Sequence, residues 1–550
     1  MKKLLTKRTF PALLAATFLL APSVQAETPY YGKTYSQPDQ VRHLYPELPI
    51  TDNTPAFSRE GEAFTSQEEM LSYIQQLQGK SPYLTVKTIG KTQEGRSIPA
   101  LYFTKDKHIN TGLLSRKPIV WVQSQIHGNE PASGEAILAI ADRLTGELGE
   151  DVLDDINVIV VPRVNPDGSY AFKRQLANGL DGNRDHMKLE SPEVQAIHKE
   201  FNKYSPEVVI DAHEYSVYSS AFRQVGEEGA LKYHDILIQS GRNLNIPERI
   251  RTTSERLFQD PVIAELESKG MTGETYYTAG LDDQGEIEIV EGSTEPRIGR
   301  NSFGLAPSFS FLVESRGIGI GREDFARRVN AQIATHEKIL TQTADHARQI
   351  KHLVASERLK LVKKGLLPND NDPIIIDSEN KEIADQTLKM VDIASGTVQD
   401  IPVNYFSATD AEPTLTRERP TAYVLMPDQK EIAEKLKNQG LKGFTLPKDV
   451  KLPAESYTVT KKESRGEYED RQLVDVETNV TKEKVTFPKG SYVFLTAQPQ
   501  TNLLSLSLEP ESVDSYVTFN YVPSEVDQKL PIYRFTIDPK KSEMKSFMNR

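Results

Sequence analysis

The sequence predicts an α/β fold in which a mixed, largely parallel sheet is flanked by helices, followed by a β-rich α+β domain. Short runs rich in β-branched or aromatic residues alternate with helical runs over the first two thirds of the chain, which is typical of α/β domains. From about Pro368 onward, strand-like runs predominate. Since 550 residues exceed the size of one ordinary core, we expect at least two domains.

The first residues predict an export signal. Basic MKKLLTKR precedes apolar FPALLAATFLLAP and the small residues of SVQA, and the apolar run is too short to span a bilayer. We therefore expect residues 1–26 to be a signal peptide and the mature protein to have no membrane span. The bacterial periplasm is the preferred location, and secretion is the second. Residues 27–60, rich in proline, tyrosine and polar residues, predict an N-terminal extension on a domain surface.

Residues 61–363 predict the main domain. Ser66 and Glu69 form a capping-box pattern before MLSYIQQL, which predicts a helix. The expected strands are YLTVKTIG, SIPALYF, PIVWVQS, INVIVVPRV, EVVIDAH and FSFLVES. Helical spacing marks GEAILAIADRLTG and PEVQAIHKEFNKY, the second with Ser191 as N-cap and Pro192 in the first turn. A long helical stretch over 324–363 is expected to close the domain.

Residues 364–550 predict a separate β-rich domain. Its strand-like runs are DPIIID, PTAYVLM, SYTVTKK, KVTFPKGSYVFLT and SYVTFNYV, with one helical run, QKEIAEKLKNQG. It carries no catalytic or metal-binding pattern, so its sequence predicts no role.

Composition excludes several kinds of site and partner. The chain has no cysteine, which excludes disulfides, thiolate metal sites, cysteine nucleophiles and lipid attachment at the signal. Loss of the signal would remove four basic residues and no acidic one from a chain whose formal net charge is already −12. Such a surface disfavours nucleic acid. No G-x-S-x-G pattern occurs at a strand-to-helix turn, which argues against a serine hydrolase.

Four apolar strands each end in polar residues. In WVQSQIHGNEPASGEA, His127 is followed three residues later by Glu130, either a metal-binding pair or an ordinary polar turn. The next strand ends in NPDG, which turn chemistry alone would explain. His213 and Glu314 end two further strands. Because sites in α/β folds lie at the carboxyl ends of strands, the four together indicate a functional site.

The ordered motifs resemble those of the zinc carboxypeptidases of the carboxypeptidase A type. The similarity runs from about residue 60 to 350 and rests on GKTQEGRSIPAL, H-x-x-E at His127, NPDG at 165–168, NGLDGNR at 178–184 and ESR at 314–316. It implies a zinc carboxypeptidase fold and hydrolysis of the C-terminal bond of a peptide substrate. One Zn²⁺ per chain would be held by His127, Glu130 and His213, a ligand set for which carboxypeptidase A is itself the familiar example.

The resemblance also implies roles for other residues. Glu314 would be the general base that takes the proton of the metal-activated water. Arg174 would stabilise the oxyanion. Asn183 and Arg184 would bind the terminal carboxylate of the substrate. Asp181 would orient a ligand histidine.

Two departures from the family pattern are present. The chain has DGNRDH where the family usually has DLNRNF, so Gly182, Asp185 and His186 are unusual. Family members cover the substrate carboxylate with a mobile Tyr shortly before the catalytic Glu, but no Tyr lies between Thr278 and Glu314. The candidate substitutes are Tyr276 and Tyr277, with Arg297 or Arg300 as carboxylate-binding residues, and Arg300 is the preferred one.

Three functions therefore stand at this point. The leading one is a zinc metallocarboxypeptidase. The alternatives are a cell-wall (murein) peptide hydrolase on the same fold and a non-catalytic peptide-binding protein with a decayed peptidase domain. Neither the side chain preferred at the substrate's end nor the oligomeric state follows from the sequence.

Overall fold

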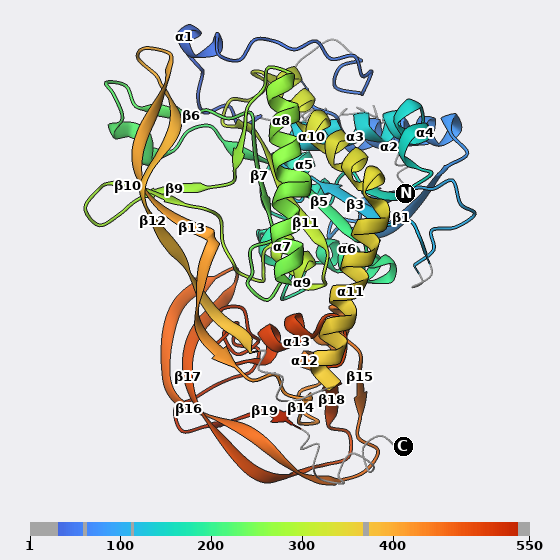
Figure 1. Ribbon diagram of the computed structural model, residues 1–550, viewed down its shortest axis with the longest axis vertical. Coiled ribbons are helices and arrows are strands. Elements are labelled where there is room, and N and C mark those ends of the chain that lie inside the picture. Colours follow the sequence, from blue (N-terminus) through green and yellow to red (C-terminus); the bar gives the residue numbers. More distant parts are fainter. Residues whose placement is uncertain (1–30, 59–62, 112–114, 367–372, 537–550) are drawn as a thin grey trace, which may run out of the picture.

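The computed structural model describes residues 31–58, 63–111, 115–366 and 373–536, and the predicted signal peptide lies outside these residues. Two parts are stacked along the long axis (Figure 1). The upper part holds the central sheet and its helices, and the lower part is built from the orange and red end of the chain. The predicted α/β fold followed by a β-rich region is confirmed.

The central sheet has eight strands in the order β1-β2-β4-β3-β5-β11-β7-β8. Its four middle strands, β4, β3, β5 and β11, are mutually parallel, and the β1–β2, β2–β4 and β11–β7 pairs are antiparallel. Their carboxyl ends therefore meet at one edge. The strands are β1 (Leu84–Lys91), β2 (Ser97–Phe103), β3 (Ile119–Ser124), β4 (Asn157–Val161), β5 (Val208–Ser216), β7 (Ile236–Ser240), β8 (Gly273–Thr275) and β11 (Phe309–Ile318).

Helices cover both faces of this sheet, which is why its strands read as almost continuous apolar runs. In β3, Val120 and Val122 pack into the core under α2, α3 and α10, whereas Ile119 and Trp121 pack against α6. The helices here are α1 (Asp39–Arg42), α2 (Gln67–Lys80), α3 (Pro131–Leu144), α4 (Glu147–Val152), α5 (Pro166–Ala171), α6 (Pro192–Tyr204), α7 (Glu248–Ser254), α8 (Asp260–Ser268), α9 (Gly299–Leu305), α10 (Phe325–Asp345) and α11 (Ala347–Leu366), with short turns η1 (Gly182–Arg184), η2 (Ser220–Gln224) and η3 (Glu255–Gln259).

The predicted helix boundaries follow local capping. The Ser66 hydroxyl accepts from the N–H of Glu69 at 3.2 Å, and the Glu69 carboxylate accepts from the N–H of Ser66 at 2.8 Å, so the capping box of α2 is confirmed. α6 starts at Pro192 after Ser191, as predicted, but the Ser191 hydroxyl donates to Asp185 rather than capping the helix. The predicted helical stretch from residue 324 is two helices, α10 and α11, separated at His346.

A second sheet joins early and late parts of the chain in the order β6-β12-β13-β10-β9. The long hairpin of β12 (Ile374–Asp392) and β13 (Thr397–Arg417) pairs on one side with β6 (Ala230–Lys232) and on the other with β10 (Ile287–Val290), which pairs with β9 (Thr278–Leu281). The predicted domain division between residues 363 and 364 stays a prediction. The second sheet takes strands from both sides of this division.

The third sheet consists only of late strands, all antiparallel, in the order β15-β18-β14-β19-β16-β17. Its strands are β14 (Ala422–Leu425), β15 (Gly443–Thr445), β16 (Val450–Tyr468), β17 (Arg471–Phe487), β18 (Tyr492–Leu495) and β19 (Lys529–Phe535). It packs with α12 (Lys430–Asn438) and α13 (Thr501–Leu508) around its own apolar core. Among the helices described, none has the length and apolar character needed to cross a membrane.

Candidate functional site

The carboxyl edge of the central sheet brings the predicted metal ligands together. His127 follows β3, and Glu130 stands directly before Pro131, the first residue of α3. His213 lies in β5, the neighbour of β3. All three side chains are buried, and their ligand atoms lie within 4.8 Å of one another.

The ligand atoms face a common point. His127 Nδ1 lies 2.8 Å from Glu130 Oε1, His213 Nδ1 lies 2.9 Å from Glu130 Oε2, and the two Nδ1 atoms are 3.1 Å apart. Zinc bonds of about 2.0–2.1 Å in tetrahedral geometry place ligand atoms about 3.3 Å apart, close to these separations. Burial opposes ionisation of Glu130, but the charges of His127 and His213 lower its pKa to about 2, so it is an anion. Two imidazoles and one carboxylate thus fit Zn²⁺.

Each ligand histidine is held by an aspartate through its other ring nitrogen. His127 Nε2 lies 3.0 Å from Asp181 Oδ1, and His213 Nε2 lies 3.1 Å from Asp211 Oδ2. Asp211 also accepts from the side chain of Gln123 at 3.0 Å. Carboxylates in this position fix the ring orientation of metal-binding histidines. Asp211 was not predicted from the sequence, although it stands two residues before His213 and hence on the same face of β5.

Glu314 lies beside His213 at the same edge. The parallel register of β5 and β11 makes Glu314 the direct partner of His213, so both side chains leave the same face of the sheet. Burial raises the pKa of Glu314, and the charge of His213 opposes the rise. The charge of Lys232, a buried lysine that sequence reasoning missed, also favours the ionised carboxylate. Burial lowers the pKa of Lys232 itself to about 8.

Arg174 reaches the metal ligands from the segment after α5. Its Nη1 lies 3.2 Å from His127 Nδ1 and 3.6 Å from Glu130 Oε1. Its Nε and Nη2 donate to Asp181 Oδ2 at 3.1 and 2.8 Å. Burial disfavours the charge of Arg174, but Asp181 and Glu130 raise its pKa, so the guanidinium stays charged. The structure therefore places a fixed cation against the ligand cluster.

The NPDG and GKTQEGRS motifs build the frame around this cluster. Asn165 caps α5 by accepting from Gly168 N–H at 2.8 Å, and it donates to the carbonyl of Ile126 at 3.2 Å. Asp167 accepts from Thr92 at 2.7 Å and from Arg96 at 2.6 Å. NPDG is therefore the start of a helix that ties three segments together, and not only a tight turn.

Gly128, between the two first ligands, touches the backbone of the NPDG segment. A Cβ added at Gly128 would lie 1.9 Å from the carbonyl carbon of Gly168 and 2.1 Å from the nitrogen of Ser169. No side chain fits there without moving one of the two backbones. The H-G-N-E and NPDG segments are thus in direct backbone contact.

The unusual DGNRDH sequence has a packing explanation. A Cβ at Gly182 would lie 2.9 Å from Ile126 Cγ1, so Ile126 occupies the space beside Gly182. Asp185 accepts from the N–H groups of Glu190 and Ser191 and fixes the entry into α6. His186 Nδ1 lies 2.9 Å from His198 Nε2 of α6 in a buried pair. These residues act on packing behind the site.

Asn183 and Arg184 lie in η1 beside the ligands. Asn183 Nδ2 lies 3.3 Å from His213 Nε2, and its Oδ1 accepts from the N–H of Gly299 at 2.7 Å, so Asn183 is held between two elements. Arg184 donates to the carbonyl of Asn183 at 2.9 Å and is half-buried. Arg184 is therefore accessible to a ligand, whereas the Asn183 amide is already bonded.

Of the two predicted arginine substitutes, only Arg300 faces the site. Arg297 is bound by Asp514 at 2.8 Å and by Glu295. Arg300 is buried, donates to the carbonyl of Ser293 at 3.2 Å and lies 5.5 Å from the ring centre of Tyr276. Burial lowers its pKa to about 10, and Glu314 and the like charge of Arg184 are among the groups near it. No carboxylate within the described ranges pairs with Arg300.

Of the two predicted tyrosine substitutes, Tyr276 lies beside Arg300, whose guanidinium is 5.5 Å from its ring centre. Burial raises the pKa of Tyr276, and Glu314, Arg300, Arg184 and Arg174 are the charges around it. Tyr277 is buried in an apolar cluster against which Tyr276 also packs, and Lys232 Nζ lies 5.0 Å from the ring centre of Tyr277.

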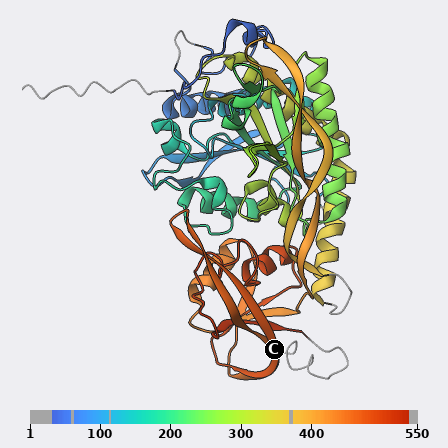
Figure 2. The same ribbon diagram turned by 90° about the vertical axis from the view of Figure 1, so that its left-hand side faces the viewer.

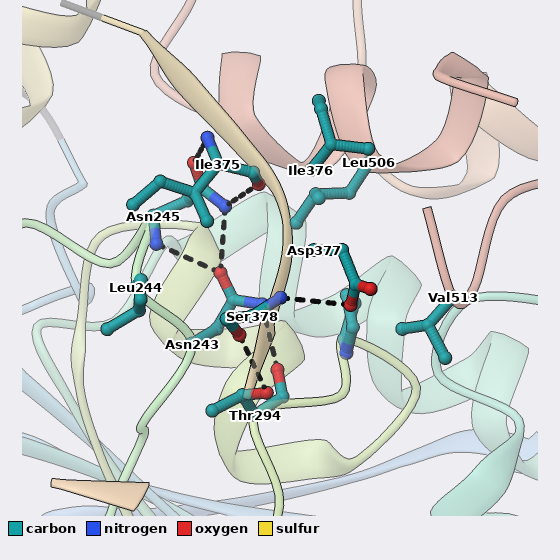
Figure 3. Close-up of a pocket in the computed structure, with 11 residues that line it drawn as sticks. Asn243, Leu244, Asn245, Thr294, Ile375, Ile376, Asp377, Ser378, Leu506 and Val513 are labelled. Atoms are coloured by element: carbon teal, nitrogen blue, oxygen red, sulfur yellow. Dashed lines mark hydrogen bonds between the residues drawn. The ribbon is translucent and has the colours of Figure 1, made fainter. Parts of the chain in front are cut away.

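The pocket in Figure 3 contains none of the predicted site residues. It lies where the start of β12 and α13 meet the segment after β7. Its polar atoms bond to one another: Asn245 donates to Ile375 O at 2.7 Å, and Thr294 and Ser378 hydroxyls lie 3.2 Å apart. These bonds connect early and late parts of the chain, so the residues around the pocket hold the two parts together.

Comparison with known proteins gives a family and full-length relatives. A family model described as zinc carboxypeptidase matches residues 70–235, which include His127, Glu130 and His213. The chain is 31% identical over 519 residues to Carboxypeptidase 2 of Trichophyton rubrum, covering 91% of this chain and 94% of the relative. It is 32% identical over 477 residues to Carboxypeptidase 2 of Trichophyton equinum, with 86% of each covered.

Solved structures give a weaker likeness. A metallo-carboxypeptidase from Pseudomonas aeruginosa superposes with a TM-score of 0.38 at 18% identity, over 52% of this chain and 69% of that one.

Proposed function

The chain belongs to the zinc carboxypeptidase family, and we propose that it removes the C-terminal residue of peptides with Glu314 as its general base. It is a zinc metallocarboxypeptidase, a peptide hydrolase whose zinc site consists of His127, Glu130 and His213. The observation that carries the proposal is the convergence of these ligands, Glu314 and Arg174 at one edge of the sheet.

The proposed chemistry divides between the metal and the chain. Zinc bound there supplies a Lewis acid that makes water acidic and polarises a carbonyl. Glu314 accepts the proton of the attacking water and returns it to the leaving amine. Its partial burial beside His213 keeps the carboxylate close to the ligands. Hydrolysis then needs no covalent link between enzyme and substrate.

Arg174 is proposed to stabilise the negative charge that develops on the carbonyl oxygen of the scissile bond. A preorganised cation costs no reorganisation when the charge appears. Asp181 holds Arg174 with two hydrogen bonds and contacts His127 with its other oxygen. Asp181 is therefore proposed to orient both a metal ligand and the oxyanion-binding group.

The carboxylate of the substrate is proposed to bind to Asn183, Arg184 and Arg300. The support for Arg184 is that its side chain is half-buried and donates a hydrogen bond to the backbone carbonyl of Asn183. The support for Arg300 is a buried guanidinium with no carboxylate partner in the part of the chain described here. A buried charge is stable only when it is paired, and a substrate carboxylate supplies that pair.

The two alternative functions now have different standing. The chain is a peptide hydrolase, so the hypothesis of a non-catalytic binding protein is set aside. Murein peptides remain an alternative substrate class on the same site. They form the second arm of the experiment below.

Export is also a proposal, and it rests on residues 1–26 of the sequence. The periplasm is proposed first and secretion second. N-terminal sequencing of the protein from separated cell fractions and medium tests both: a mature chain that begins at Glu27 supports export, and an intact Met1 in the cytoplasm contradicts it.

The proposed function is tested with matched peptides that carry free or amidated C-termini, alongside murein peptides, with and without a zinc chelator. We expect release of the last residue from free ends only, and loss of that release with chelator. Equal cleavage of amidated peptides would contradict exopeptidase action. Cleavage restricted to murein peptides would favour the alternative substrate class.

A further inference from the structure

One hairpin of the late β-rich region reaches the candidate site. The β16–β17 ladder extends from Val450↔Phe487 to Tyr468↔Arg471 with two register shifts on the way, whereas pairing of β16 with β19 ends at Thr458. Beyond that point the ribbon leaves its sheet. Figure 2 shows it extending upward from the lower part of the molecule to the catalytic region.

In the outer part of this ribbon, β16 is exposed and β17 is partly buried. The residues of β16 from Glu463 to Glu467 are exposed, whereas Tyr468 and Glu469 are half-buried. In β17, which pairs with this part of β16, Leu473 and Val474 are buried, and the N–H of Val474 donates to the carbonyl of Thr518 at 3.0 Å. The ribbon is therefore held along β17 as well as at its end. We call Tyr468 and Glu469 the hairpin tip.

Glu469 contacts the loop that carries Asp181. Its carboxylate accepts from the backbone N–H of Asp181 at 2.7 Å, and its carbonyl accepts from Lys188 Nζ at 3.4 Å. Glu469 and Asp470 form the two-residue turn, and both have positive φ, at 50° and 56°. Residues other than glycine pay for this conformation, so the contact at Asp181 holds a locally unfavourable turn.

Tyr468 stacks against an arginine of the catalytic region. The guanidinium of Arg297 is 4.9 Å from its ring centre, and Asp514 fixes Arg297 through 2.7 and 2.8 Å hydrogen bonds. Burial raises the pKa of Tyr468, and the charge of Arg184 acts against the rise. The phenol is therefore neutral and able to donate beside Arg184.

The flank of the tip is anchored as well. Arg471 pairs with Glu190, which also accepts from Tyr521, and the guanidinium of Arg471 lies 4.0 Å from the ring centre of Tyr521. Glu190 follows closely after the DGNRDH segment. The hairpin is thus fixed to the same loop on both sides of Arg184.

We propose that the hairpin tip is part of the peptide-binding site, with Tyr468 contacting the C-terminal residue of the substrate beside Arg184 and Glu469 positioning the Asp181–Arg184 loop. This inference rests on the proposed function, since it takes Arg184 as a ligand of the substrate carboxylate. It gives the late β-rich region a role in substrate recognition. The tip also supplies a tyrosine where the expected tyrosine before Glu314 is missing from the sequence.

The test of Tyr468 is the separation of KM from kcat for a peptide with a free C-terminus. Losing one hydrogen bond and ring contact corresponds to about 1.4 kcal/mol, a tenfold change. We expect Tyr468→Ala to raise KM about tenfold, with kcat within threefold of the parent. Glu463→Gln, on the exposed part of the same ribbon, is the matched control and leaves both constants unchanged.

The test of Glu469 uses a conservative rescue. Glu469→Ala removes the acceptor for Asp181 N–H, and we expect kcat to fall several-fold, because Asp181 orients Arg174. Glu469→Gln keeps an acceptor oxygen and is expected to restore most of kcat. A merely structural contribution would instead lower the unfolding temperature of both variants without separating their kcat values.

Results that would overturn the inference are an unchanged KM in Tyr468→Ala, or equal kcat in Glu469→Ala and the parent. Zinc content and the unfolding temperature of each variant show that it is folded and loaded. The parent enzyme is assayed in parallel with Glu314→Gln and with chelator. If those abolish hydrolysis while the tip variants act like the parent, the inference fails and the proposed function stands.

Discussion

The edge of the central sheet and the late β-rich region differ in how they contribute to the site. At the sheet edge, ligands and catalytic candidates come from strands that are neighbours in the fold, and each follows an apolar run. The third sheet, formed by the late region alone, is entirely antiparallel, and none of the ten histidines of the chain lies after residue 352. Its contact with the Asp181 loop includes a hairpin end that reaches across from another sheet.

Two kinds of residue build this site. Those at the sheet edge are buried with their polar partners and are fixed by strand register. Those of the hairpin tip are fixed by tertiary contact alone. We expect the first kind to control chemistry and metal binding, and the second to control substrate recognition.

Replacing the proposed base gives the largest expected effect at the sheet edge. Glu314→Gln keeps the shape of the side chain but cannot accept the proton, so kcat should fall about 10²- to 10⁴-fold. Steady-state kinetics with a free-ended peptide measures this, and metal analysis should show unchanged zinc. A kcat within tenfold of the parent would remove Glu314 from the role of base and break the contrast between the two regions.

Replacing the aspartates behind the ligands gives the next effect. Asp181→Asn should lower zinc affinity about 10- to 100-fold, as should Asp211→Asn, because each carboxylate faces the second nitrogen of a ligand histidine. Only Asp181 also binds Arg174. We therefore expect kcat at saturating zinc to fall further in Asp181→Asn. Zinc titration measures the affinity, and equal kcat values in the two variants would contradict a link from Asp181 to Arg174.

Replacing Arg300 tests its proposed contact with the substrate carboxylate. Arg300→Gln should reduce kcat/KM about tenfold for free-ended peptides, because a charge-assisted hydrogen bond is lost. Peptides ending in Glu, Leu and Lys locate the contact: an equal loss on all three assigns it to the terminal carboxylate. Arg249→Gln, an exposed arginine paired with Glu357, is the control. No loss on any peptide would remove Arg300 from the site.

The smallest expected effect concerns stability in acid. It distinguishes the two regions because all ten histidines lie before the late region. Burial lowers the pKa of His336 to about 3 from an ordinary 6.5, and it has no partner for either ring nitrogen in the described chain. As the pH falls, the unfolded state binds a proton at this histidine before the folded state does. The free energy of unfolding is therefore undiminished by His336 above pH 6.5 and decreases as the pH drops from there toward 3. The slope is about 1.4 kcal/mol per pH unit for one such histidine.

Replacing His336 with leucine should therefore flatten the decline in unfolding temperature between pH 6.5 and 5. Denaturation followed at several pH values measures the slope, with His352→Leu at an exposed position as control. A slope equal to that of the parent would mean that other groups cause the acid sensitivity.

The sequence predicted the sheet edge well because its signals are local. Strand-end polarity, the H-x-x-E spacing and the capping box of α2 each depend on residues close together in the chain. It also indicated Arg300 over Arg297 without a reason, and the reason is tertiary: Asp514, more than two hundred residues away, binds Arg297. Strand alternation places Asp211 on the same face of β5 as His213, so the local sequence contains the signal for it.

The hairpin tip could not be predicted, because nothing near Tyr468 or Glu469 in the sequence marks a site. Their importance arises from contacts with Asp181 and Arg297, which are far away in the chain. The second sheet was missed for the same reason. Strand pairing between β13 and β10 depends on how the late chain returns to the early one.

The backbone contact of Gly128 with Gly168 has a consequence for anyone who transplants this zinc site into another scaffold. The loop that carries two ligands and the helix start that follows the next strand pack backbone against backbone, and no side chain can be inserted between them. The two segments therefore have to be treated as one structural unit. A graft of the H-G-N-E loop alone would lack the NPDG segment against which this loop packs. The smallest transferable piece is therefore both strands with both loops, moved together.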